Sequence, residues 1–403
     1  MNPLLLSGFG ISISVDKRRL IIQNKLANER LEYYPHQISH DSIIVDSHTG
    51  NITFEAIRWL MKHDIPVTML NWNGNLLGVT LPQGPKAGKL RIAQYGKHLD
   101  RKARYDIAAR IVNQKIVNSY NLLKELARFY DVLDVNEIER TFASEEVNYK
   151  QNHAGKNANS LLMLYEGMIA TFYWDCLAEV CNKLYPNFHF KSRKNKSYSW
   201  NMNAADEINA LLNYGYAILE SEVRKDINAI GLDPTVGFLH ELAESKEPLV
   251  YDMQELFRWL VDLSVIQLLE EKKLKKSDFI VTENYNIRLR ELTAKALIEK
   301  IRLNMNAKAA FKGRNATHQT ILSGHIHSLA HFVIGRNKAL SFDVPKLAVK
   351  RNDNLDVRQR ILTMTPSERK ALAISKSTLW YQKKHLSEGK RLRVYDKIMA
   401  KIT

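Results

Sequence analysis

The sequence predicts an α+β multidomain protein with a small N-terminal β domain, a large all-α domain and a C-terminal helix-turn-helix. Three observations predict this fold class. Residues 1–84 contain short runs rich in Ile and Val, residues 85–343 follow a helical pattern, and residues 344–403 become strongly basic. A chain of 403 residues is also too long for one ordinary hydrophobic core.

The N-terminal β domain is predicted from its alternating short elements. The stretches GISISV, RRLIIQN, RLEYYP and SIIVDS are typical of strands. SHTGN predicts a turn, and ITFEAIRWLMKHDI places Ile52, Ala56, Trp59 and Leu60 on one helical face. PVTMLN, WNGN and LLGVTLP then predict a strand, a hairpin turn and a strand.

The all-α domain begins after PQGPKAGK, where two Pro and two Gly interrupt the pattern at residues 82–89. From there nearly everything is predicted to be helical to about residue 340. The entry is basic, because residues 86–115 contain nine Lys or Arg beside Asp100 and Asp106. Such a run predicts either a solvated helix face or a surface that follows a phosphate backbone, and the sequence favours neither.

Charge and cysteine usage limit the functional class. The net charge of +16 suits a polyanionic partner, of which nucleic acid is the commonest. Cys176 and Cys181 fall on different faces of one predicted helix, so we expect no disulfide between them. The N-terminus has no basic stretch before its short apolar run, and no run approaches the roughly 18 apolar residues of a membrane span. We therefore expect a cytoplasmic protein.

The last segment, residues 344–403, contains fifteen Lys or Arg against five Asp or Glu. Within it TPSERKALAISKSTLWYQKKHL predicts two helices, with Thr365 as the first N-cap and Ser375 or Ser377 as the second. Two short helices around a tight turn, the second one basic, predict a DNA-binding helix-turn-helix. The alternative is a basic helical tail that packs on the core.

The second helix of this motif supplies the candidate DNA contacts. Side chains near its N-terminal end are expected to meet base edges in the major groove, and later cations are expected to contact phosphates. The candidates for base edges are Lys376, Thr378 and Gln382. The candidates for phosphates are Lys383, Lys384, Lys390 and Arg391.

Three segments of the helical domain carry candidate catalytic side chains. LLMLYEGMIATFYW places Glu166 in an apolar helix without a nearby cation, so a distant partner, a proton or a metal ion must neutralise it. GLDPTVGFLH interrupts the helical pattern and ends on His240. LVYDMQELFRWLVD predicts one helix with Asp252 and Glu255 one turn apart. Glu166 and Glu255 together with His240 give two carboxylates and an imidazole, a set that suits Mg²⁺ or Mn²⁺, and the imidazole favours Mn²⁺.

A second candidate metal pair is weaker. His327 and His331 in HIHSLAHFVIG stand four apart, a spacing that zinc-binding helices use. No Glu lies between them in the zinc-protease pattern, so we do not expect a metal site there.

Four segments in order resemble one known family: LYEGMIATFYW, LNYGYAIL, GLDPTVGFLH and LVYDMQELFRWLVD. They are similar to the CRISPR-associated integrases, metal-dependent enzymes that insert spacers into repeat arrays. The similarity runs through about residues 1–340 and makes the all-α part the catalytic domain. It implies that Glu166, His240 and Glu255 are catalytic metal ligands for Mn²⁺ or Mg²⁺, with Asp252 and Arg258 beside them.

The basic extension separates this chain from most CRISPR integrases, which end soon after the helical domain. Casposases, the related transposases, have a similar core and commonly carry such a helix-turn-helix. The resemblance therefore points to a metal-dependent casposase that joins DNA 3′-OH ends to double-stranded target DNA by transesterification, as a homodimer or higher homo-oligomer. Three alternatives stay open: a CRISPR adaptation integrase with a small partner dimer, a simple metal nuclease, and an inactive DNA-binding regulator.

Overall fold

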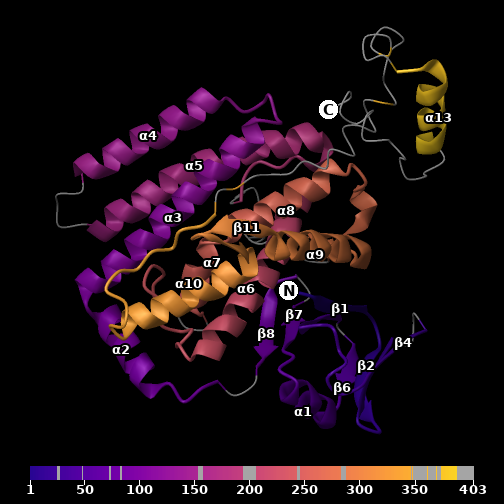
Figure 1. Ribbon diagram of the computed structural model, residues 1–403, viewed down its shortest axis with the longest axis horizontal. Coiled ribbons are helices and arrows are strands. Elements are labelled where there is room, and N and C mark those ends of the chain that lie inside the picture. The colour runs from indigo at the N-terminus through magenta and orange to yellow at the C-terminus, as the bar shows by residue number, and fades with distance from the viewer. Residues whose placement is uncertain are drawn as a thin grey trace. The chain divides into compact units, whose positions relative to one another are not determined.

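The computed structural model forms two compact units, residues 1–347 and 348–403. The structure describes residues 1–24, 28–47, 49–71, 74–81, 84–152, 158–193, 206–242, 246–282, 287–345, 347, 361, 369 and 374–387. The β-rich start and the helical region both belong to the first unit (Figure 1). The second unit begins four residues after the start predicted for the basic domain.

The N-terminal region contains two four-stranded sheets. The first has the order β1 (Pro3–Gly8), β5 (Ser42–Ser47), β7 (Val67–Leu70) and β8 (Leu76–Thr80), all parallel except β8. The second has the order β4 (Glu29–Tyr33), β3 (Arg19–Asn24), β2 (Ile11–Asp16) and β6 (Gly50–Ile52), in which β6 runs parallel to β2 and the other pairs are antiparallel. Helix α1 (Phe54–Lys62) follows β6.

Alternating burial explains these strands. In β2, Ile11 and Ile13 are buried in the core that the two sheets share with α1, whereas Ser12 is not buried. The Thr53 hydroxyl accepts from Ala56 N at 3.1 Å and begins α1, whose Trp59 is buried on the predicted face. The predicted strands of this region are confirmed, and so is the helix with Ala56, Trp59 and Leu60 buried on one face. Ile52, which was predicted on that face, lies in β6 instead.

Two strands were not predicted. β1 lies in the short apolar run at the start of the chain, and β6 lies where SHTGN predicted only a turn. β6 approaches β2 so closely that a Cβ on Gly50 would lie 2.2 Å from the Ile11 carbonyl oxygen. Glycine is required there, so a residue that signals a turn in the sequence serves a strand pairing instead.

The rest of the first unit is mainly helical, as predicted. Its helices are α2 (Gly88–Leu99), α3 (Arg101–Ala127), α4 (Val135–Asn152), α5 (Ala158–Leu184), α6 (Glu207–Ile230), α7 (Pro248–Glu255), α8 (Arg258–Glu270), α9 (Glu291–Asn306) and α10 (His318–Val333), with 3₁₀ turns at Pro186–Phe188 and Lys276–Asp278. Two short antiparallel hairpins interrupt the helical pattern, β9 (Phe279–Val281) with β10 (Ile287–Leu289) and β11 (Lys308–Phe311) with β12 (Arg314–Thr317).

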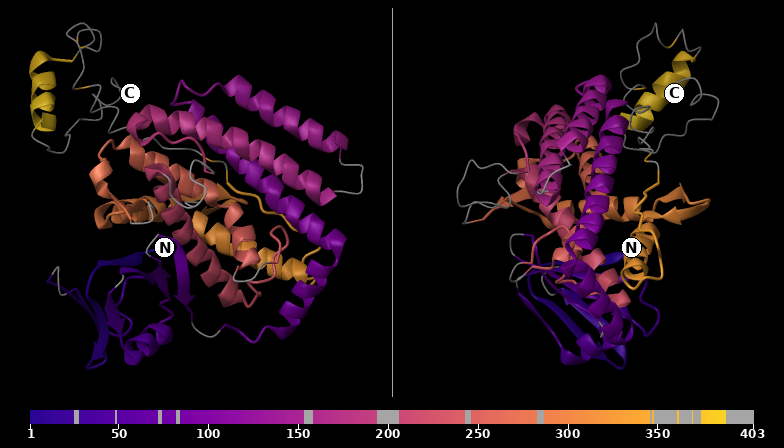
Figure 2. Two further views of the ribbon diagram at one scale, coloured as in Figure 1. Left: turned by 180° about the vertical axis from the view of Figure 1, so that it is seen from behind. Right: turned by 90° about the vertical axis from the view of Figure 1, so that its left-hand side faces the viewer.

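Two long helices organise the helical region. Helix α3 packs against α4, α5, α7 and α8, and α6 packs against α7, α8, α9 and α10 (Figures 1 and 2). Between them, α7 and α8 are almost entirely buried. Polar groups from α3, α5, α7 and α8 can therefore meet inside the first unit.

The second unit is described in part. Helix α13 (Lys376–Ser387) corresponds to the second helix of the predicted motif, and the Ser375 hydroxyl caps it by accepting from Thr378 N at 3.0 Å. Most of the first predicted helix, Lys390 and Arg391 lie outside the described residues. Among the described helices of the chain, none combines the length and apolarity that a membrane crossing requires.

Candidate active site

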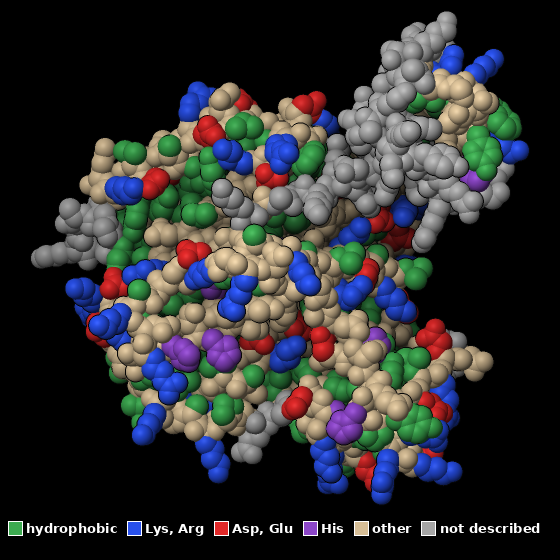
Figure 3. All heavy atoms as spheres, viewed as in Figure 1, with side chains coloured by type: hydrophobic (Ala, Val, Ile, Leu, Met, Phe, Trp, Pro, Cys, Tyr) green, Lys and Arg blue, Asp and Glu red, His purple; other side chains and the backbone are tan. Residues whose placement is uncertain are grey.

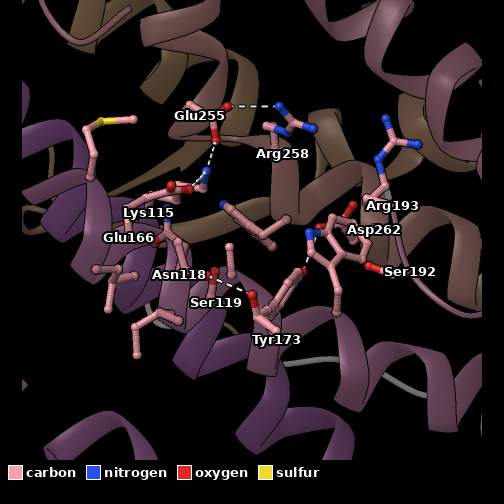
Figure 4. A pocket seen from close by; sticks show the side chains of 18 of the residues that line it. Lys115, Asn118, Ser119, Glu166, Tyr173, Ser192, Arg193, Glu255, Arg258 and Asp262 are labelled. Carbon is pink, nitrogen blue, oxygen red and sulfur yellow. Dashed lines mark hydrogen bonds and ion pairs between the residues drawn. The ribbon is translucent and has the colours of Figure 1, made fainter. Parts of the chain in front are cut away.

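The predicted site residues converge on one cavity of the first unit. It has a volume of about 620 Å³ and lies among α3, α5, α6, α7 and α8. Glu166, His240, Glu255 and Arg258 all line it, together with Lys115 (Figure 4). Glu166, His240 and Glu255, which span 90 positions in the sequence, are thus brought to one place.

Lys115 is the group that neutralises Glu166. Its ammonium lies 2.5 Å from Glu166 Oε1 and 2.7 Å from Glu255 Oε2, so it bridges two carboxylates from α5 and α7. The sequence offered three ways to compensate Glu166, and the structure shows a distant cation. Lys115 was missed as a site residue because it ends the basic run 86–115 and looks there like one more surface charge.

The loop 231–240 begins with a helix stop. Gly231 ends α6 in the left-handed conformation, with φ of 90°, and its N–H donates to Ile227 O and Asn228 O. The loop is then held by α2, because the buried Gln94 amide donates to Asp233 O at 2.8 Å and to Val236 O at 2.7 Å. Its backbone position is therefore fixed from outside the loop.

Asp252 holds the end of this loop. Its carboxylate is fully buried and accepts from the backbone N–H groups of Phe238, Leu239 and His240. It also lies 2.8 Å from His240 Nδ1. Because a carboxylate only accepts, Nδ1 carries the proton and Nε2 is left for a ligand. Burial lowers the pKa of His240, but Asp252 outweighs it, so that pKa is raised.

A small residue is needed where loop and helix meet. A Cβ on Gly237 would lie 2.7 Å from Asp252 Oδ2 and 2.8 Å from the carbonyl carbon of Pro248. Such contacts are far shorter than van der Waals distance, so Gly237 allows the close approach that lets Asp252 reach three successive N–H groups.

The stretch 249–262 was predicted as one helix, and this prediction is wrong. Helix α7 ends at Glu255 and α8 begins at Arg258. The Leu256 carbonyl at the break accepts from Asn118 Nδ2 of α3 at 2.9 Å and from Trp259 Nε1 at 3.2 Å. A tertiary hydrogen bond from Asn118 and a local one from Trp259 thus satisfy a carbonyl that a continuous helix would have used. Glu255 ends the helix before the break, and Arg258 begins the helix after it.

Glu255 is held ionised by two cations. Arg258 Nη1 lies 2.8 Å from Glu255 Oε1, and Lys115 lies on the other oxygen. Burial raises the pKa of Glu255, but Arg258 and Lys115 outweigh burial and bring it down to about 2. Asp252 therefore contacts His240, and Arg258 contacts Glu255.

A polar network that the sequence did not reveal continues the cavity wall. Tyr173 and Tyr216 donate their hydroxyls to the buried Asp262. The Arg258 guanidinium lies over the Tyr216 ring, 4.1 Å from its centroid, and Arg193 lies 5.2 Å from the same centroid. Arg193 and Asp262 line the cavity on the side away from Lys115 (Figure 4).

The donor set suits a divalent cation. The Lys115 ammonium marks a position for positive charge between the two carboxylates, and His240 shows the arrangement in which a ligand histidine donates its other ring N–H to a carboxylate. As they stand, no three His, Cys, Asp or Glu side chains of the described chain are grouped to hold a metal ion. A divalent cation held by these residues would take the position that the Lys115 ammonium occupies between Glu166 and Glu255.

Other sequence candidates fall elsewhere. The rings of His327 and His331 are 6.4 Å apart on α10, and no described metal group includes them. Cys176 and Cys181 are buried free thiols, as expected.

The basic run 86–115 partly serves the fold. Arg91, Arg104 and Arg110 donate to the carbonyl oxygens of Gly231, Phe238 and Leu340, and Lys115 belongs to the cavity. Figure 3 shows Lys and Arg spread among Asp and Glu over the viewed face of the molecule. The run is therefore neither a purely solvated face nor a purely phosphate-following one.

The described DNA-contact candidates differ in exposure. Lys376 and Lys384 are exposed, and Lys383 is half-buried. Gln382 is 6% exposed, so it is badly placed to reach a base edge, and we remove it from that set. The Thr378 hydroxyl contacts the capping Ser375 at 2.6 Å. Trp380 and Tyr381, which the sequence did not single out as contacts, are exposed beside them.

Known proteins are similar to this chain over most of its length. A profile of the family described as CRISPR associated protein Cas1 matches residues 4–302. The CRISPR-associated endonuclease Cas1 1 of Archaeoglobus fulgidus is 26% identical over 84% of this chain and 98% of its own length.

Two solved structures are also similar. A casposase bound to an integration product has a TM-score of 0.77 and 34% identity, over 90% of this chain and 99% of that one. A Cas1 protein from Thermotoga maritima shares the fold, with a TM-score of 0.68 and 18% identity over 85% of this chain and 100% of that one.

Proposed function

The chain belongs to the Cas1 family of DNA endonucleases and integrases, and on this premise we propose that it is a casposase that joins DNA 3′-OH ends to target DNA. Enzymes of this family depend on a metal ion. The observation that carries the assignment to DNA joining is the cavity in which Glu166, His240 and Glu255 meet.

The extent of the similarity supports the casposase over other members. The casposase similarity covers 90% of 403 residues, about 363, so it includes at least about 16 residues beyond the 347 of the first unit. The Archaeoglobus relative covers 84%, which the first unit alone can accommodate. The second unit is the part that a spacer integrase without an extension would lack.

Each polar residue of the cavity has a separate role in this proposal. Glu166, Glu255 and His240 Nε2 would hold Mn²⁺ or Mg²⁺, and Asp252 orients His240. Arg258 fixes one oxygen of Glu255 and leaves the other toward Lys115. When bound, the ion would stabilise negative charge on the phosphoryl oxygens and assist the attacking hydroxyl.

The reaction is a balanced exchange of phosphodiester bonds. The 3′ oxygen of the incoming end bonds to a target phosphorus, and the target strand releases its own 3′-OH. No protein nucleophile is needed. Tyr165, next to Glu166, is buried and stacks on Tyr149 with the ring centroids 4.7 Å apart, which suits a core residue.

Ligand variants test the activity. Glu166→Gln, His240→Asn and Glu255→Gln are each expected to lower joining by about 100-fold or more, as loss of transition-state stabilisation does. Glu179→Gln, at an exposed position of the same helix as Glu166, serves as the control. Sequencing of joined products with Mn²⁺, Mg²⁺ or chelator gives the readout. Full strand joining by Glu166→Gln would exclude the ligand assignment.

The second candidate is a CRISPR adaptation integrase, favoured by the names of the curated relatives. The two functions differ in their need for a partner. A casposase should insert ends as a homo-oligomer, since two staggered insertions need two active sites. Strict dependence on a small partner dimer would favour the CRISPR integrase, and cleavage without joined product would favour a nuclease.

A further inference from the structure

The cavity contains two guanidinium groups, Arg258 and Arg193. Arg193 has no role in the proposed metal site. It follows the 3₁₀ turn at Pro186–Phe188 and lines the same cavity as Glu166, His240 and Glu255. Unlike Arg258, which pairs with Glu255, it has no carboxylate within ion-pair distance in the described parts of the chain. The twelve residues that follow it, 194–205, contain no Asp or Glu.

Neutral amides fix the guanidinium in place. Arg193 Nη1 donates to Asn209 Oδ1 at 2.7 Å, and Nη2 donates to Asn213 Oδ1 at 2.8 Å. The two asparagines are four residues apart on α6, so they lie on one helix face. The Asn209 amide is itself oriented, because its Nδ2 donates to Asp206 Oδ2 at 2.7 Å and Ser192 O at 3.0 Å. The two hydrogen bonds that position the guanidinium therefore come from neutral amides.

The carboxylate on this side of the cavity compensates Arg193 only in part. Asp262 is held by the hydroxyls of Tyr173 and Tyr216. Burial lowers the pKa of Arg193 and the neighbouring Arg258 acts in the same direction, whereas Tyr216, Asp262 and Asp206 raise it without outweighing burial. An arginine nevertheless stays protonated in a protein, so its burial is a cost that a bound anion would offset.

From this geometry we propose that Arg193 binds a phosphodiester of the DNA next to the one that reacts. The proposal rests on the proposed joining function. A guanidinium presents paired N–H donors that match two phosphate oxygens, and Arg193 retains donors beyond the two that the asparagines use. The Tyr216 ring lies against both Arg193 and Arg258, so the anchor is next to the proposed catalytic groups.

Two variants separate a phosphate contact from a structural role. Arg193→Gln removes the charge, and Asn213→Asp keeps Arg193 but gives it a carboxylate partner of almost the same shape. A structural role predicts that Asn213→Asp leaves binding unchanged or improves it. A phosphate-binding role predicts that both variants bind DNA about 10-fold more weakly, although Asn213→Asp folds at least as stably as the wild type. Arg302→Gln on α9 controls for the loss of one positive charge elsewhere.

The measurement is equilibrium binding, by fluorescence anisotropy, of a synthetic branched DNA that represents the joined product, with thermal unfolding recorded in parallel. Neutral methylphosphonates are placed singly beside the junction, in the incoming strand or in the target strand. One position should weaken wild-type binding about 10-fold and leave Arg193→Gln unaffected, and the strand that holds it identifies the contact. The proposal would be overturned if every methylphosphonate position weakened binding by Arg193→Gln as much as it weakened binding by the wild type. Unchanged DNA binding by Asn213→Asp would also overturn it. DNA binding is measured without any catalytic step, so a protein that binds DNA through Arg193 but does not join ends would contradict the joining function and not this proposal.

Discussion

At the scale of single residues, Asp252 is the side chain on which the geometry of His240 depends. One oxygen accepts from Phe238 N and Leu239 N, and the other accepts from His240 N and Nδ1. Asp252→Asn replaces one oxygen by an NH₂ group that cannot accept. We expect a loss of about 1–3 kcal/mol in the free energy of unfolding, because buried N–H groups lose their acceptor, and a joining rate lowered about 10-fold or more.

Chemical denaturation and joining assays on the same preparation check this prediction. Asp233→Asn is the matched control, since Asp233 caps Thr235 within the same loop but is not buried. Wild-type joining by Asp252→Asn would mean that His240 does not need a fixed ring orientation.

Lys115 leads to a second prediction at this scale. If its ammonium takes the place of the metal ion between Glu166 and Glu255, Lys115→Met should leave two carboxylates uncompensated when no metal is present. Breaking such a buried ion pair costs about 3–5 kcal/mol, and the partial exposure of Lys115 puts our expectation below that range. Mn²⁺ should restore the loss, because it would bind to the vacated position.

Thermal unfolding with and without Mn²⁺ measures the effect. The rise in Tm on adding Mn²⁺ should be larger for Lys115→Met than for the wild type. Lys124→Met is the control, because Lys124 lies on the same helix as Lys115 and the change removes a surface ion pair with Glu139 of α4. An equal rise in both proteins would show that Lys115 and the ion do not compete.

The residue scale also shows what a sequence can and cannot reveal. Glu166 in an apolar helix indicates that something must neutralise it, because the cost of burying a charge follows from its neighbours alone. The neighbours of Glu166 do not identify the partner, because Lys115 is 51 positions away and looks like the other cations of its own basic run. Arg193 was missed for a related reason, since its two amide partners become neighbours only when the chain folds.

At the scale of elements, the loop 231–240 and helix α7 act as one unit. Gly237 makes their close approach possible, and a Cβ there would lie within 2.8 Å of Pro248 atoms and Asp252 Oδ2. Gly237→Ala must therefore move the loop or the start of α7. Overpacking of this kind costs about 1–3 kcal/mol, and it should lower joining together with stability.

Gly324→Ala in α10 is the control, because an added Cβ there meets nothing within 4 Å. Unfolding and joining are measured for both variants. If Gly237→Ala joins ends normally, the position of the loop does not control His240.

The element scale also explains the failed prediction for residues 249–262. Helical periodicity runs unbroken through Leu256 and Phe257, so nothing local marks a break. The break exists because Asn118 of α3 and the Trp259 indole satisfy the Leu256 carbonyl. By contrast, the stop at Gly231 was predicted, because a glycine in the left-handed conformation is a local device.

At the scale of the whole molecule, positive charge is concentrated in the second unit. Residues 348–403 contain fourteen Lys and Arg against five Asp and Glu, a large part of the chain's net charge of +16. If this unit contacts DNA, removing it should reduce the number of counterions that binding releases. A protein ending at Leu347 should therefore show a shallower fall of log K with log salt than the full chain, by about 0.9 for each phosphate that the second unit neutralises.

The truncated protein should retain metal-dependent joining, because the cavity lies within residues 1–347, but its insertions should scatter. Sequencing of insertion sites and salt titrations of DNA binding give the two readouts. A full-length Lys383→Gln and Lys384→Gln double variant guards against effects of truncation itself, and its slope should fall by up to about 2. Unchanged insertion sites after truncation would remove target reading from the second unit, and an unchanged slope would remove phosphate binding. If only the slope changes, the unit holds DNA without choosing where the ends are joined.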